Sequence, residues 1–79
     1  MAMIKTDLFE RIEKNRNSIH KPTNATYTVF SVDEKRIFQI DTYGSPDRVM
    51  PEKISQTIQM DKEMAKVLVK LLRQEFDIN

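Results

Sequence analysis

The spacing of apolar residues changes once along this chain, and that change most constrains its fold. Between residues 25 and 60, β-branched and aromatic residues alternate with polar ones, as is typical of strands with two different faces. From residue 64 to residue 76, apolar residues recur every three or four positions, which predicts a stripe along an α-helix. A chain of 79 residues is long enough for one small domain. The pattern therefore predicts a single α+β domain over residues 1–79.

Three strands are predicted in the middle of the chain. Residues 25–32 and 36–43 flank the polar break Asp33-Glu34-Lys35, which has the length of a hairpin loop. A third strand is expected over residues 53–60, where apolar and polar residues alternate. Consecutive strands with short connections form an antiparallel meander. The sheet is expected to have three or four strands, because residues 16–23 could supply a fourth.

Helices are predicted at both ends of the chain. The C-terminal one covers residues 62–76, is amphipathic, and has Asp61 as its N-cap. It is expected to pack on one face of the sheet, with Phe30 and Phe38 in the core beneath it. A short N-terminal helix is predicted over residues 7–15, which begin with an aspartate and place Leu and Ile at a spacing of four.

The composition argues against a self-contained enzyme. The chain has no Cys and one Gly, so it holds neither a thiolate nor a glycine-rich phosphate loop. Its one His, His20, lies in a polar loop and is expected to be exposed. Asp41 could bind a metal or act as a base, or it could accept a hydrogen bond from the turn at Gly44-Ser45 or pair with Arg48. We therefore predict a protein without catalytic residues, metal or cofactor.

Charged residues are spread through the first fourteen positions, so this segment lacks the apolar core of a secretory signal. No stretch approaches the eighteen or so apolar residues that a membrane span needs. We therefore expect a cytosolic protein that does not bind membranes.

Basic and aromatic residues gather in the predicted sheet region. Single-stranded nucleic acid is bound by such mixtures, since cations attract phosphates and rings stack on bases. The net charge is only +1, so a basic surface must come from arrangement and not from total charge. The predicted nucleic-acid-binding residues are Lys35, Arg36, Arg48, Lys53, Tyr43 and Tyr27.

The second half of the chain resembles the Positive Cofactor Four family of transcriptional coactivators. The similarity lies in the strand Phe38-Gln39-Ile40-Asp41, the loop Ser45-Pro46-Asp47-Arg48, the run Lys53-Ile54-Ser55-Gln56-Thr57-Ile58 and the helix after Asp61. The resemblance implies a curved antiparallel sheet followed by one helix, dimerisation through the helix, and binding of single-stranded DNA on the sheet. By this resemblance Arg48 and Lys53 would contact phosphate and Tyr43 would stack on a base.

The chain is also similar to a group of short bacterial proteins of uncharacterised function. The shared core reads Gln39-Ile40-Asp41-Thr42-Tyr43-Gly44-Ser45, then Asp47-Arg48, Pro51, Lys53 and Ser55-Gln56-Thr57-Ile58-Gln59. This resemblance implies no mechanism.

The small size of the predicted core favours a homodimer, which would bury further apolar surface and the sheet edges. Two functions remain open. The first is a small non-enzymatic protein that binds single-stranded nucleic acid in transcription or another DNA transaction. The alternative is a protein-interaction module, an accessory or inhibitory subunit of a larger enzyme in a restriction, phage-defence or counter-defence system.

Overall fold

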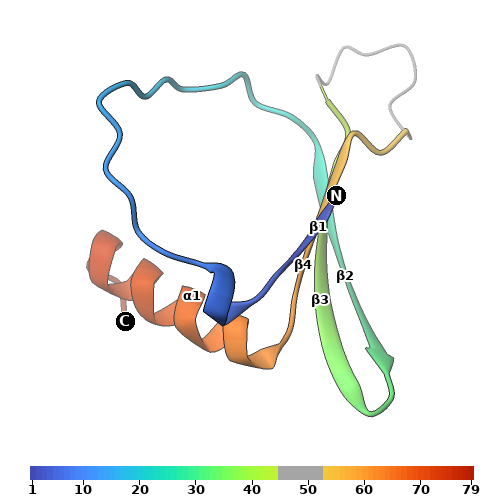
Figure 1. Ribbon diagram of the computed structural model, residues 1–79. Coiled ribbons are helices and arrows are strands. Elements are labelled where there is room, and N and C mark those ends of the chain that lie inside the picture. Colours follow the sequence, from blue (N-terminus) through green and yellow to red (C-terminus); the bar gives the residue numbers. More distant parts are fainter. Residues whose placement is uncertain (45–52) are drawn as a thin grey trace.

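The computed structural model describes residues 1–44 and 53–79 of the chain (Figure 1). The fold is α+β, with a four-stranded sheet followed by one C-terminal helix. In chain order the elements are β1 (Ala2–Ile4), the 3-10 turn η1 (Thr6–Leu8), β2 (Ala25–Val32), β3 (Lys35–Thr42), β4 (Gln56–Met60) and α1 (Lys62–Phe76).

The sheet is mixed, with the strand order β1-β4-β3-β2. The predicted meander is confirmed for β2, β3 and β4, which pair antiparallel. The predicted third strand is shorter than expected, since β4 begins at Gln56. A fourth strand is present, but it is β1, which pairs parallel with β4, and not residues 16–23, which the sequence had allowed as its source. The sheet is therefore not wholly antiparallel.

The hairpin between β2 and β3 turns on two residues, Asp33 and Glu34. Val32 pairs with Lys35, so Lys35 belongs to the strand and not to the loop. Both loop residues have positive φ, 51° and 65°, which is the geometry of a type I′ turn. Neither is a glycine, so the turn holds two residues with a Cβ in the left-handed region.

The predicted N-terminal helix over residues 7–15 is wrong. Only η1 forms there, and residues 9–24 have no regular structure. Short helices persist only when tertiary packing covers their apolar side. Here Leu8 and Ile12, which would form that side, remain exposed. Residues 9–24 instead form a wide arc between η1 and β2 (Figure 1).

The two faces of the sheet follow from the strand register. One face, called here the helix side, has α1 beyond it. The other is called the far face. The helix side carries Tyr27, Val29, Arg36, Phe38, Ile40, Ile58 and Met60. The far face carries Thr26, Thr28, Phe30, Ile37, Gln39, Asp41, Thr57 and Gln59. Phe30 and Phe38 therefore lie on opposite faces, and the expectation that both fill the core under the helix is wrong.

Helix α1 has the predicted bounds and the predicted cap. The Asp61 carboxylate accepts a hydrogen bond from the backbone N–H of Met64 at 3.0 Å. Met64 is only 1% exposed and joins α1 to the sheet. Further along, α1 leaves the sheet (Figure 1), and Leu72 and Phe76 are exposed. The expected packing on one face is thus limited to the first turns of the helix.

The buried core of the described residues is small. Its apolar members are Ile37, Met60 and Met64. The chain exposes 7323 Å², whereas a compact monomer of this mass exposes about 5,000 Å². The fold therefore leaves apolar surface open along residues 8–19, along α1 and on the helix side of the sheet.

Candidate nucleic-acid interface

An aromatic pair lies on the helix side of the sheet. Tyr27 from β2 and Phe38 from β3 stack with their ring centroids 5.3 Å apart and an interplanar angle of 11°. The two rings are reached from solvent, since Tyr27 is 70% exposed and Phe38 is 36% exposed. Antiparallel pairing places them diagonally across two neighbouring strands, because Val29 and not Tyr27 pairs directly with Phe38. The pair thus presents a flat apolar surface on which a further planar group could stack.

Cations flank this aromatic pair. Arg36 is two residues before Phe38 on β3 and shares its face, and Lys62 stands in the first turn of α1. Both border a hollow of about 310 Å³ between the sheet and α1. Its lining residues are Val29, Arg36, Phe38, Met60, Asp61, Lys62 and Ala65. Guanidinium and ammonium groups in this position can reach the phosphates of a strand whose bases meet the rings.

A second hollow, of about 630 Å³, adjoins the hairpin end of the sheet. It is lined by Glu34, Lys35, Arg36, Asp61, Lys62 and Glu63. Within the described residues, no ion pair involves the three cations of this group, whereas the acids are partly neutralised by others. Glu63 lies 3.9 Å from Lys66, and Asp61 pairs with Lys5. The unpaired basic groups therefore outweigh the unpaired acidic ones at this end of the sheet.

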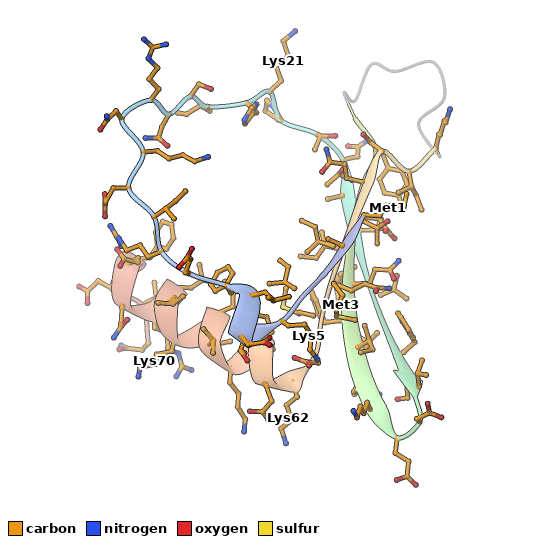
Figure 2. The ribbon with its side chains drawn as sticks, in the orientation of Figure 1. Met1, Met3, Lys5, Lys21, Lys62 and Lys70 are labelled. Carbon is orange, nitrogen blue, oxygen red and sulfur yellow. The ribbon has the colours of Figure 1, made fainter. Side chains whose placement is uncertain are left out.

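The Lys5–Asp61 pair joins the end of β1 to the start of α1. Lys5 is drawn close to the beginning of α1 in Figure 2. The hydrogen bond from Lys5 lowers the pKa of Asp61 below its ordinary value, and the bond from the Met64 N–H adds to this. The same hydrogen bond raises the pKa of Lys5. The pair thus fixes the position of α1 relative to the sheet beside the candidate site.

The structure brings two of the six predicted binding residues, Tyr27 and Arg36, to the helix side of the sheet. Lys35 borders the hollow at the hairpin end, but the register places it on the far face with Ile37. Tyr43 lies at the other end, where its hydroxyl is 2.8 Å from the Thr26 Oγ1 on the far face. Lys53 lies before β4 and not in it. Arg48 lies outside the described residues.

Two members of the site were missed in the sequence. Phe38 was assigned to the core, although its alternation with Arg36 already placed the two on one face. Lys62 was not among the predicted binding residues. Its position directly after the N-cap was the available signal, because the first turn is the part of α1 nearest the sheet.

Asp41 has a structural environment on the far face. It is 5% exposed and accepts hydrogen bonds from Thr57 Oγ1 at 2.7 Å and from Gln39 Nε2 at 3.1 and 3.2 Å. Gln39 in turn accepts from Gln59 Nε2 at 2.7 Å. These bonds cross from β3 to β4, so Asp41 is held by its own neighbours in the sheet. The expected partners were the turn at Gly44-Ser45 and Arg48, of which Ser45 and Arg48 lie outside the described residues; the donors that the structure shows are Thr57 and Gln39.

The remaining features of the described residues concern metal ligands, His20 and membrane-spanning helices. No three His, Cys, Asp or Glu side chains converge there as metal ligands would. His20 is exposed within the irregular 9–24 segment. Among the described residues, no helix has the length and apolar character to cross a membrane.

Comparisons of the chain with protein-family models, with curated proteins and with solved structures find no match.

Proposed function

We propose that this chain is a non-enzymatic, cytosolic protein that binds single-stranded nucleic acid at the Tyr27–Phe38 pair. The observation that supports it best is the exposed, stacked ring pair with Arg36 on the same face. The unpaired cations Lys35 and Lys62 border the same end of the sheet. The resemblance to the Positive Cofactor Four family implies the same class of ligand, although it places the contacts at other residues.

The mechanism combines stacking with electrostatic attraction. A base stacked on an exposed ring contributes about 1–3 kcal/mol, and any base can do so because all have a flat face. Three cations that each neutralise a phosphate give a log–log salt slope of about −2 for a single strand. Affinity should then fall about 20-fold between 50 and 200 mM salt. A duplex hides its bases, so it offers the rings nothing to stack on.

Fluorescence anisotropy with a labelled ~20-mer of single-stranded DNA, against a duplex of the same sequence, tests this proposal. Tyr27→Ala should weaken binding about 10-fold or more. Arg36→Ala should weaken it and make the salt slope shallower by about 0.7. Lys70→Ala is the matched control, since Lys70 is a cation of α1 that does not border the hollow beside Phe38. Equal losses for Arg36→Ala and Lys70→Ala, or no binding at 50 mM salt, would contradict the proposal.

A specific observation favours the second candidate, a protein-interaction module that docks on a larger enzyme. The last turns of α1 leave the sheet with Val69, Leu72 and Phe76 exposed. An amphipathic helix of this kind fits an apolar groove in a partner. An affinity pull-down tests it: a captured enzyme that is lost with Leu72→Lys and kept with Lys70→Ala supports the module. If neither substitution changes the amount of enzyme captured, the result counts against the protein-interaction module.

A further inference from the structure

The two edges of the sheet differ sharply. The edge formed by β1 is three residues long and is followed by Lys5, which binds Asp61. The edge formed by β2 is eight residues long and contains no charged residue, no Pro and no Gly. Its register with β3 is one-to-one over all eight residues, so no bulge interrupts it. Sheet proteins commonly protect an exposed edge with such features, and β2 has none of them.

The backbone of β2 has hydrogen-bonding groups that point away from β3. The N–H of Tyr43 donates to the carbonyl of Asn24 at 3.0 Å, which makes these two residues a hydrogen-bonded pair. Such pairs alternate along an antiparallel ladder, so the even-numbered residues of β2 bond to β3. The peptide groups of Tyr27 and Val29, and of the other odd-numbered residues, face outward. Figure 1 shows β2 at the edge of the sheet that lies away from α1.

We infer that β2 pairs antiparallel with β2 of a second copy of this chain, so that two sheets join into one of eight strands. A two-fold axis places β2 of one copy opposite β2 of the other. Charged residues in the strand would then face like charges, which destabilises the pairing. The eight residues of β2 carry no charge, so the strand is compatible with its own copy.

The chain also has surface left to bury against a second copy. It exposes about 2,300 Å² more than a compact monomer of its mass, distributed over the 9–24 segment, α1 and the sheet. The two-fold pairing also gives a closed assembly of two copies. It uses the long edge of each copy and leaves the short β1 edges outermost, which favours a dimer over a growing fibre.

Measuring the mass of the protein in solution, without nucleic acid, tests the inference. Sedimentation over a range of concentrations should give twice the chain mass of 9.3 kDa. Val29→Pro removes an outward N–H and no bond to β3, so it should give a monomer that keeps its sheet signal in circular dichroism. Val69→Lys, on the exposed side of α1, should remain dimeric. A monomeric wild type at ~100 µM, well above a typical specific-complex Kd, or a dimeric Val29→Pro would overturn the inference.

Cross-linking decides the matter even where a proline variant does not fold. The chain has no cysteine, so single Cys variants report one position each. Around a two-fold axis one residue near the middle of β2 opposes its own copy at about 4.5–5.5 Å between Cα atoms, within disulfide reach. Thr28→Cys or Val29→Cys should therefore give covalent dimers with a mild oxidant. Val69→Cys and Met3→Cys should not. Cross-linking at Val69 alone would instead place the interface on α1.

Dimerisation through β2 would also double the proposed binding surface, a consequence that rests on the proposed function. The two-fold axis stands perpendicular to the joined sheet, so both Tyr27–Phe38 pairs come to the same face. A strand long enough to reach both should bind more tightly than one that reaches a single pair. Ser31→Pro removes another outward N–H of β2 at a residue that borders neither hollow, so it should weaken binding of a ~20-mer while leaving that of a ~5-mer unchanged. Equal effects on both lengths would contradict the shared surface. A proline variant whose mass in solution equals that of the wild type would contradict dimerisation through β2.

Discussion

The turn between β2 and β3 offers a direct test of the backbone geometry. Asp33 and Glu34 have φ of 51° and 65°, a region that costs a residue with a Cβ about 1–2 kcal/mol. Aspartate tolerates this region better than glutamate does, because its short side chain can bond to the nearby backbone. The strain should therefore be concentrated at Glu34, and glycine is the residue that would relieve it.

Glu34→Gly should stabilise the fold by about 1 kcal/mol. The relief of about 1–2 kcal/mol exceeds the extra entropy that glycine loses on folding, about 0.5–1 kcal/mol. For a domain of this size, 1 kcal/mol corresponds to a rise in Tm of about 4–8 °C. Thermal unfolding followed by circular dichroism measures it, at one fixed protein concentration because assembly changes the Tm.

Two control variants separate the backbone effect from other causes. Glu34→Ala removes the same charge but keeps a Cβ, so it should give little or no stabilisation. Lys35→Gly places glycine one residue later, in extended backbone, and should lower the Tm. If Glu34→Ala stabilises as much as Glu34→Gly, the gain comes from charge and the reasoning from φ is refuted.

Three further substitutions test the interior and the helix cap. Thr57→Val removes the 2.7 Å donor to buried Asp41 and should destabilise by about 1.5–3 kcal/mol in denaturant titration; a change within 0.5 kcal/mol would contradict the role given to this bond. Met64→Ala should cost about 2–5 kcal/mol, whereas Val69→Ala on the exposed side should cost far less, and equal costs would mean that α1 is packed otherwise. The pKa of Asp61 is lowered, so its contribution to stability is present above the ordinary value of 3.8 and is lost as the pH falls through its lowered pKa. Asp61→Asn should therefore flatten the acid side of the curve of Tm against pH, and an unchanged acid side would contradict the ion pair.

Much of the fold could be predicted from local patterns. The bounds of β2 and α1 agree with the sequence prediction, since each has a strong periodicity and clear polar boundaries. The Asp61 cap agrees as well, because an N-cap depends only on residues three positions apart. The antiparallel order of β2, β3 and β4 agrees with the prediction that consecutive strands are neighbours in the sheet.

The remaining features depend on contacts that a local pattern does not contain. A strand as short as β1 shows no periodicity, and its partner β4 lies more than fifty residues away. The N-terminal segment carries a helix-like spacing, but Leu8 and Ile12 stay exposed, so tertiary packing does not stabilise a helix there. A loop of two residues instead of three also shifts which residues of β2 and β3 are opposite. Without the β2–β3 register, Phe30 could not be assigned to one face of the sheet. The stacking of Tyr27 on Phe38 could not be predicted either.

The parallel pairing of β1 with β4 has a consequence for the order in which the sheet opens. The β2–β3 hairpin closes over two residues, whereas β1 must find β4 across nearly the whole chain for only three register pairs. Local unfolding starts where few contacts oppose a large gain in chain entropy, so β1 should detach first, with the fastest amide hydrogen exchange in the sheet. Its departure uncovers the edge of β4. The sheet then has an unpaired strand at both edges, so the stability of a three-residue strand determines how often the edge of β4 is open to another chain.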